Sequence, residues 1–187
     1  MPLPKILCGP ILRRTEKNKV SVWIAYSRNY GLKLKIYEGD SVKVKANSDS
    51  SAEIVSTAEG VNEVPLKADE VNAIVKNGQA VTAQFGRNLW VSVISAEPQT
   101  AFQTGKTYSY NINFRSADTP GDKGDFRTEG LLKDEDTDGR PNKALGYKKD
   151  ILPSFILPAD DADKLFIAHA SCRKLHGHGN DALAYLD

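Results

Sequence analysis

Apolar and polar side chains alternate in several stretches of the first part of the chain. In residues 20–26, valine, isoleucine and tyrosine occupy one face of an extended chain, whereas serine, tryptophan and alanine occupy the other. Residues 89–94 and 108–115 alternate in the same way. A period of two is typical of β-strands, so strands are predicted at all three stretches, the first of them buried on one side and partly covered on the other.

Two lysine-rich stretches show the same alternation. Lysines separate the apolar residues within 32–36 and again within 42–45, and Glu38-Gly39-Asp40 lies between the two stretches. This pattern predicts a hairpin with a lysine-lined solvent face and a loop longer than a tight Asn-Gly turn.

The middle of the chain has a less regular pattern. Residues 48–60 are small and polar, as expected of a loop or a weak edge strand. Residues 69–76 fit either a short helix closed by Asn77-Gly78 or another strand. The strand is favoured because the neighbouring elements are strands.

Short strands separated by turn residues, without a long amphipathic helix, predict an all-β fold. We expect a fibronectin type III/immunoglobulin-like antiparallel β-sandwich from about Leu7 to Phe114. The segment Phe102-x-x-Gly105-x-Thr107-Tyr108-x-Tyr110 resembles the turn and strand of fibronectin type III domains that carry a corner tyrosine. We therefore expect Tyr108 or Tyr110 to form a hydrogen bond with the preceding loop.

Composition changes after Ala117 and divides the chain into three predicted regions. Residues 1–117 form the N-terminal sandwich, and residues 118–164 form a loop and connector. Residues 118–139 are rich in Gly, Asp, Lys and Thr, which predicts a mobile loop without a packed element. The two prolines within 152–158 limit that stretch to an edge strand or an extended connector.

Residues 165–187 are predicted to be the truncated β-α start of a second domain. Leu165 to Ala170 reads as an apolar strand, and Asn180-Asp181 supplies a cap and a first-turn acid for a helix that continues to the last residue.

Bulk properties exclude several classes of protein. The 187 residues, 40% of them hydrophobic, suit one compact domain or one domain with an incomplete second piece. The 25 Lys and Arg against 24 Asp and Glu create no field that would attract nucleic acid or an anionic membrane. Cys8 and Cys172 are too few for a disulfide-stapled fold, and no export signal or membrane span is recognisable. We therefore expect a cytoplasmic location.

An acidic stretch places carboxylates at calcium-loop spacing. Asp134, Asp136 and Asp138 occupy the first, third and fifth positions of such a loop, with Gly139 at the sixth. The twelfth position, which should be glutamate, is Leu145. A solvated acidic loop is favoured, and weak calcium binding by residues 134–139 is the alternative.

A second constellation gathers all three histidines and one of the two cysteines near the C-terminus. Thiolate and imidazole are the ligands that transition metals favour, so Cys172, His169, His176 and His178 are candidate metal ligands. The alternative is a core strand that ends in a polar turn, with His176 and His178 solvated among glycines. Both interpretations remain open at the level of the sequence.

An ordered set of segments carries a family resemblance: Gly9-Pro10-Ile11-Leu12-Arg13-Arg14, Val20-Ser21-Val22-Trp23, Tyr108-x-Tyr110, Ala144-Leu145-Gly146-Tyr147, Leu152-Pro153-Ser154-Phe155 and His169-Ala-Ser-Cys172-Arg173. Together they resemble the PhoD-like metallophosphatase (alkaline phosphatase/phosphodiesterase) family over essentially the whole chain. In that family a fibronectin-like or immunoglobulin-like sandwich precedes a calcineurin-like hydrolase domain, whose first strand ends in a Ser-Cys motif.

The resemblance implies an iron and calcium ions for a full-length member, with Cys172 as a thiolate ligand to the iron. The other ligands, including those of a Gly-Asp-x-x-Tyr-like motif, would follow Asp181, and this sequence does not contain them. The expected function is therefore that of a non-catalytic N-terminal module of a phosphoric ester hydrolase, inactive and without cofactor as this fragment.

The expected partners are the missing catalytic domain and a second copy of the chain, paired through the exposed strand Leu165 to Ala170. Two alternatives are a small metal-binding protein using Cys172 and the nearby histidines, and a stand-alone β-sandwich that binds a protein or sugar. An exposed aromatic patch would favour the binding module, and its candidate residues are Trp23, Tyr26, Tyr30 and Trp90.

Overall fold

The computed structural model describes most of the chain as two compact units. Residues 3–46, 52–55, 62–67, 81–116, 118–119, 121–132, 145 and 150–165 are described. The first unit is Met1–Leu157 and the second is Pro158–Asp187. The predicted elements at 69–76 and from Phe166 onward lie outside the described residues.

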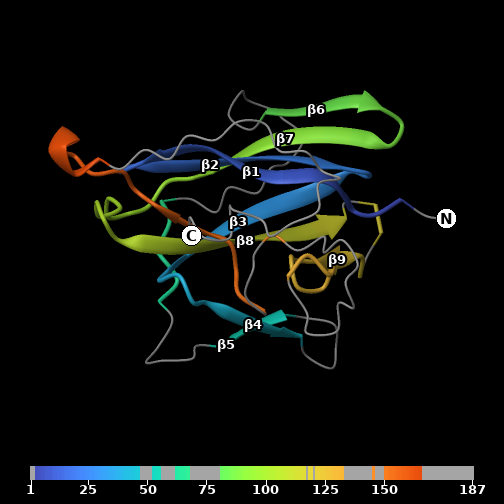
Figure 1. Ribbon diagram of the computed structural model, residues 1–187. Helices are drawn as coiled ribbons and strands as arrows, with labels where there is room; N and C mark the ends of the chain where they lie inside the picture. Colours follow the sequence, from blue (N-terminus) through green and yellow to red (C-terminus); the bar gives the residue numbers. More distant parts are fainter. Residues whose placement is uncertain are drawn as a thin grey trace, which may run out of the picture. The chain divides into compact units, whose positions relative to one another are not determined.

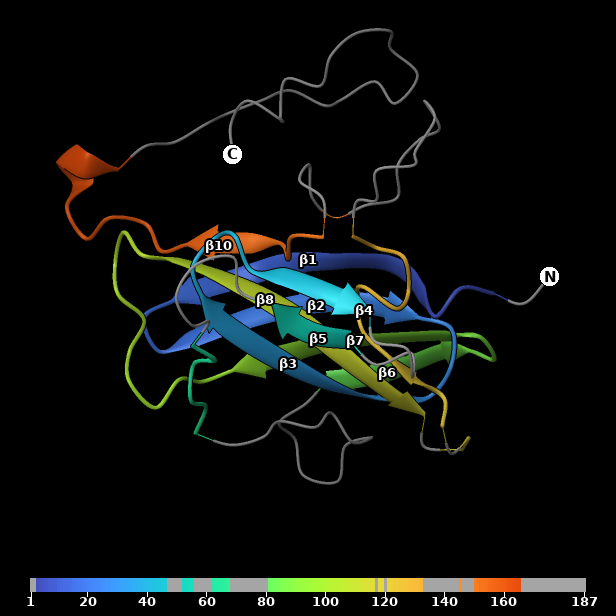
Figure 2. The same cartoon turned by 90° about the horizontal axis from the view of Figure 1, so that it is seen from below.

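Two antiparallel sheets form the sandwich of the first unit and lie as layers one above the other in Figure 1. Sheet A has the order β1-β2-β7-β6, and sheet B has the order β10-β8-β3 with the short β9 also paired to β8. Figure 2 shows β8 with β3 along one side and β10 along the other. The strands are β1 (Ile6–Glu16), β2 (Lys19–Tyr26), β3 (Tyr30–Glu38), β6 (Val81–Gly86), β7 (Leu89–Ala96), β8 (Thr107–Ser116), β9 (Lys123–Gly124) and β10 (Ser154–Ile156).

The strand order identifies the type of sandwich. Without the short strands β4, β5 and β9, the strands that form the framework of the two layers are, in chain order, β1, β2, β3, β6, β7, β8 and β10. The first, second, fifth and fourth of these make sheet A, and the third, sixth and seventh make sheet B. That is the ABED and CFG arrangement of a constant-type immunoglobulin sandwich. The predicted all-β, immunoglobulin-like antiparallel fold is therefore confirmed.

The core lies between the sheets and follows the predicted period of two. On β2 the residues that were predicted to share one face are completely buried, and β3 and β8 contribute alternate residues from the opposite layer. Each such side chain contributes about 1.5–3 kcal/mol by leaving water. The aliphatic residues of these strands that are no more than 2% exposed are Val20, Val22, Ile24, Leu32, Leu34, Ile36 and Ile112.

Tyr108 makes the corner contact expected at the start of β8. Its hydroxyl accepts a hydrogen bond from the backbone N–H of Gln103, 2.9 Å away. Gly105 supplies the turn between them at a φ of 76°, a conformation that residues with a side chain rarely adopt. The Tyr108 ring packs 4.8 Å from that of Phe102 and stacks 5.6 Å from that of Phe155 on β10.

The predicted hairpin between residues 32–36 and 42–45 is wrong, although both strands exist. The whole of β3 pairs with β8, whereas β4 (Lys43–Ala46) pairs with β5 (Ala52–Val55) in a separate two-stranded sheet. Alternation reveals which face of a strand is buried but not which strand lies beside it. The small, polar stretch after Ser48 does contain a strand, β5.

Residues 121–132 pack on the sandwich, so the prediction of a loop without packed structure from 118 to 139 is wrong for this part. Phe126 is completely buried, Leu132 is buried, and β9 pairs with the end of β8. The composition is polar, but these two large apolar side chains are enough to anchor the segment. Residues 133–140 lie outside the described residues.

The first unit ends with β10, which completes sheet B. Leu152, Phe155 and Leu157 are buried in the core. The unit therefore extends to residue 157, beyond the boundary at residue 117 that composition suggested. In the second unit, Asp161 caps a short 3-10 helix, Ala162–Lys164.

Candidate functional site

The residues predicted to bind metal lie outside the described part of the chain. Cys172 and His169, with His176 and His178, belong to the undescribed end of the second unit, and the acidic stretch 134–139 lies in another undescribed segment. Among the residues that are described, no group of three or more His, Cys, Asp or Glu side chains is placed to hold a metal ion.

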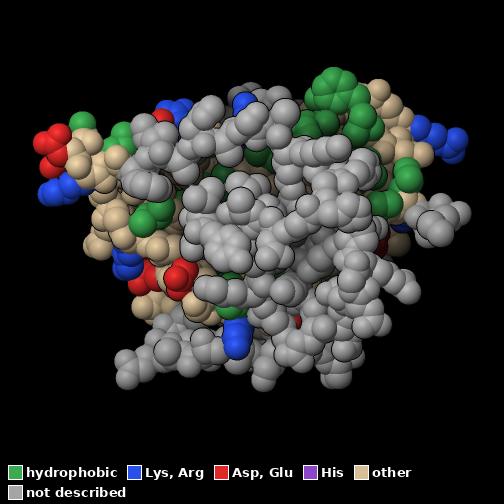
Figure 3. Space-filling model, viewed as in Figure 1, with side chains coloured by type: hydrophobic (Ala, Val, Ile, Leu, Met, Phe, Trp, Pro, Cys, Tyr) green, Lys and Arg blue, Asp and Glu red, His purple; other side chains and the backbone are tan. Residues whose placement is uncertain are grey.

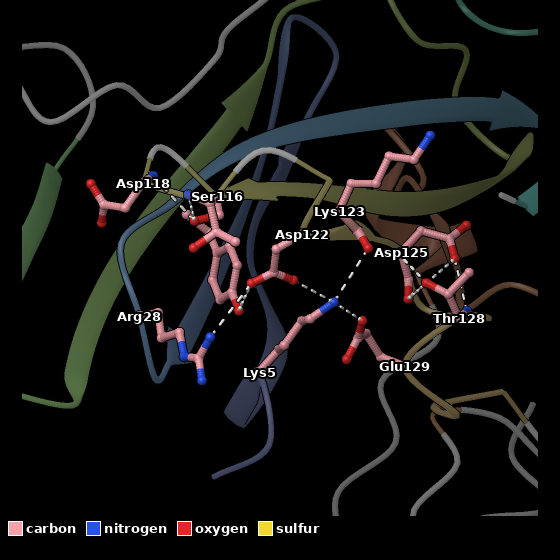
Figure 4. A network of polar contacts seen from close by, with 11 residues as sticks. Lys5, Arg28, Ser116, Asp118, Asp122, Lys123, Asp125, Thr128 and Glu129 are labelled. Carbon is pink, nitrogen blue, oxygen red and sulfur yellow. Dashed lines mark hydrogen bonds and ion pairs between the residues drawn. The ribbon is translucent and has the colours of Figure 1, made fainter. Parts of the chain in front are cut away.

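Three ion pairs that share Lys5 and Asp122 form a network at one end of the sandwich. Lys5, Arg28, Asp122 and Glu129 are labelled in Figure 4, and together with Tyr30, which bonds to Asp122, we call them the end cluster. Lys5 comes just before β1, Arg28 lies in the turn between β2 and β3, and Tyr30 is the first residue of β3. The two carboxylates belong to the segment after β8. The fold thus brings together residues that are far apart along the chain.

Lys5 occupies the centre of this cluster. Its ammonium group lies 3.0 Å from Asp122 Oδ1, 2.7 Å from Glu129 Oε1 and 3.3 Å from the backbone oxygen of Lys123. Figure 4 shows the side chain pointing between the two carboxylates. An ammonium group has three protons to donate, so all of them have acceptors here.

The other oxygen of Asp122 faces β3. The Tyr30 hydroxyl donates a hydrogen bond to Oδ2 at 3.0 Å, and a guanidinium nitrogen of Arg28 lies 3.7 Å from the same atom. Both oxygens of this carboxylate therefore have cationic or hydrogen-bonding partners.

These contacts shift three pKa values. Burial raises the pKa of Tyr30 to about 12, and its hydrogen bond to Asp122 acts in the same direction. For Asp122, burial favours the neutral acid, but the hydrogen bonds from Lys5 and Tyr30 outweigh it and hold the pKa below its usual value. Burial likewise opposes the charge of Lys5, and the hydrogen bonds to Glu129 and Asp122 outweigh it, so its pKa is raised.

A second polar group lies beside the end cluster and is buried. Asp125 is 4% exposed and accepts hydrogen bonds from Asn111 Nδ2 at 2.8 Å and from the backbone N–H groups of Arg127 and Thr128, each at 3.0 Å. The N–H of Phe126 donates to Asn111 Oδ1 at 3.3 Å. This network fixes the turn after β9 against the middle of β8.

The charged and hydrogen-bonding atoms of the end cluster and of the Asp125 network interact with partners in the same chain. The carboxylates of Asp122, Glu129 and Asp125 are paired with donors of the same domain, and none of the described residues here forms a group that could hold a metal ion. Their effect is to fasten the start of β1 and the segment 121–132 to the end of the sandwich. The sequence carries no local signal for them, because Lys5 and Lys123 are separated by 118 positions.

The four candidate residues for an aromatic patch do not form one surface. Tyr26 and Tyr30 are buried in the core, with their rings 6.3 Å apart, and Trp90 is partly buried against the core. Trp23 lies on the opposite face of β2, where its register partners are Ile11 and Val93. These residues therefore do not present a shared aromatic binding surface.

The fold and the site define an immunoglobulin-like β-sandwich with a self-neutralised charged cluster at one end. Comparison with family models, with curated proteins and with solved structures found no match to this chain. In the part of the chain that the structure describes, no helix is long and apolar enough to cross a membrane.

Proposed function

We propose that this chain is the non-catalytic N-terminal module of a PhoD-like phosphoric ester hydrolase and is inactive on its own. The division of the chain after Leu157 supports this most directly. A sandwich that is closed by β10 is followed at once by a separate unit, and the His169 to Arg173 segment falls within that unit. This matches the order of a sandwich and then a hydrolase domain that the resemblance implies.

The positions of four other resembling segments give further support, whereas the fifth, 144–147, lies outside the described residues except for Leu145. Residues 9–14 lie on β1, 20–23 on β2 and 108–110 on β8, and residues 152–155 lead into β10. All four belong to the framework of the sandwich rather than to its connecting loops. A set of motifs that follows the framework is what a shared domain architecture would produce.

Chemistry supports the lack of activity. Phosphoryl transfer at a multi-metal centre needs several carboxylate and imidazole ligands that hold the attacking and leaving oxygens in line. Cys172 would supply the thiolate for an iron, with His169 as a further candidate, but the sequence does not contain the Gly-Asp-x-x-Tyr-like motif that would supply the other ligands. The module would then act by supporting or orienting the hydrolase domain.

Activity assays test the first part of the proposal. The purified chain, with iron and calcium supplied, is expected to show no turnover of p-nitrophenyl phosphate or of its bis ester. Metal-dependent turnover that disappears in Cys172→Ala would contradict the proposal, because it would mean that this chain contains a working centre.

The reading frame after Asp187 tests the second part. We expect the genomic sequence to continue in frame with a Gly-Asp-x-x-Tyr motif. A stop codon at that position, or a continuation without carboxylate and histidine motifs, would separate this sandwich from the metallophosphatases.

A further inference from the structure

Most strand edges of the sandwich carry a feature that discourages further pairing. β1 contains Pro10, which has no N–H to donate, and shows three shifts of register against β2. The outer side of β3 is already occupied, since Val64 N–H donates to Ile36 O at 2.9 Å and Glu38 N–H donates to Asn62 O at 3.0 Å. β10 has only three residues and is flanked by prolines.

The outer edge of β6 lacks these features. The strand Val-Thr-Ala-Gln-Phe-Gly has neither a charged residue nor a proline. It pairs with β7 on one side, and within the described residues no strand pairs with it on the other. Its one register shift falls at the hairpin end, between Gln84 and Gly86. An uncharged, regular edge of this kind is a template for another strand.

Side-chain contacts establish which way β6 faces. Thr82 Oγ1 lies 2.7 Å from Ser92 Oγ, and Ser92 Oγ lies 2.7 Å from the buried Tyr26 hydroxyl, so Thr82 points toward the core. Ala83, the next residue, therefore belongs to the outer face, where its register partner is Val91.

Apolar side chains extend this edge toward solvent. Phe85 at the end of β6 is 70% exposed, and Leu89 across the turn is 39% exposed. Figure 3 shows hydrophobic side chains gathered at the upper right, over β6 and β7. On the outer face of sheet A, the register row through Ala83 continues with Val91 and Ala25 and contains no charge. A strand added to β6 would extend this row.

We propose that β6 is the site at which a second copy of this chain adds, forming an antiparallel β6–β6 pair and one continuous sheet. Two observations favour a copy over another partner. The edge has no charge that would select an oppositely charged segment, and no charge that would repel the β6 strand of a second copy. It is also self-complementary, because antiparallel pairing centred on Ala83 sets Thr82 opposite the partner's Gln84, side by side on the inner face.

The length of the β6 edge limits the affinity that the proposed dimer can have. A stable interface buries about 800 Å² on each partner, and a strand of six residues buries less. The dimer should therefore form in a concentration-dependent way, with monomer prevailing on dilution. This contact differs from pairing through Leu165 to Ala170, which belongs to the other unit of the chain.

Charge substitution at Ala83 tests the proposed register. In Ala83→Lys, and separately in Ala83→Glu, like charges would face each other across the two-fold axis, so self-association measured by sedimentation velocity should weaken at least about tenfold. An equimolar mixture of the two variants should dimerise again, since opposite charges then meet. Ala83 is on the outer face, so circular dichroism and melting temperature should stay close to those of the parent chain.

Ile11→Lys is the matched control, because it places the same charge on the outer face of β1, at the other edge of sheet A. It should leave self-association unchanged. The proposal is overturned by a full-length chain that stays monomeric at the highest soluble concentration, by an Ala83→Lys variant that dimerises like the parent, or by a mixture that does not recover. A dimer that is lost only when residues after Lys164 are removed would also overturn it.

Discussion

The hydroxyl of Tyr108 links the turn after Phe102 to the first residues of β8. Replacing it in Tyr108→Phe removes the acceptor for the N–H of Gln103 while the ring still packs on Phe102 and Phe155. We expect a loss of about 1 kcal/mol in the free energy of unfolding, measured by urea denaturation.

Tyr110→Phe is the control for this substitution. Tyr110 lies on the same strand and is equally buried, but within the described residues no hydrogen bond of its hydroxyl is found. Its replacement should change the free energy of unfolding by less than about 0.5 kcal/mol. Equal effects of the two substitutions would show that the hydrogen bond between Tyr108 and Gln103 does not contribute measurably to the free energy of unfolding.

Lys5 joins the start of β1 to the segment that carries Asp122 and Glu129. Lys5→Met keeps much of the side-chain volume but leaves the two carboxylates without their shared cation, so we expect a loss of about 1 kcal/mol, smaller at high salt. Lys123→Met, at an exposed position that uses only its backbone oxygen in the cluster, should have little effect. Equal unfolding midpoints for Lys5→Met and the parent chain would refute this role.

At the scale of elements, β10 and the segment 121–132 decide where the sandwich ends. A chain that stops after residue 157 should unfold cooperatively, like the corresponding unit of the whole protein. A chain that stops after residue 117 should not fold stably, because it loses buried side chains that are each worth about 1.5–3 kcal/mol, against a typical total stability of roughly 5–15 kcal/mol. Those side chains are Phe126, Leu132, Leu152, Phe155 and Leu157.

Thermal unfolding and the dispersion of amide resonances would distinguish the two truncated chains. A well-dispersed spectrum from the shorter chain would mean that the strands up to β8 are sufficient, and that β10 is an accessory strand rather than part of the framework.

For the whole molecule, buried tyrosines predict a loss of stability at alkaline pH. Burial raises the pKa of Tyr30 from 10.0 to about 12, and it also raises those of Tyr37 and Tyr110. The unfolded chain therefore loses these protons first, so the stabilisation is complete below pH 10 and declines as the pH rises toward 12. Urea denaturation at pH 8 and pH 11 should show a lower free energy of unfolding at pH 11.

The variant Tyr30→Phe separates one contribution from the rest. It removes a titrating hydroxyl, so the difference in stability between pH 8 and pH 11 should become smaller than in the parent chain. An unchanged difference would show that Tyr30 ionises equally easily in the folded and unfolded states.

Much of the architecture follows from local patterns in the chain. The alternation within 20–26 and 108–115 predicted both strands, and within 20–26 it also predicted the face that is completely buried, because a residue's face in a strand depends only on its position along that strand. The corner tyrosine was also predictable, since the glycine turn and Tyr108 lie a few residues apart. These features need no knowledge of distant residues.

Pairing between distant segments was decided by the tertiary structure alone. Alternation in β3 fits any neighbouring strand, and only the packing of the two layers makes β8 its partner rather than β4. The polar segment 121–132 was predicted to be unpacked, yet Phe126 packs among the core side chains. No pattern in the neighbouring sequence indicates this contact. The end cluster is the clearest example of such pairing, because Lys5 and Glu129 are far apart along the chain and are brought together only by the fold of the sandwich.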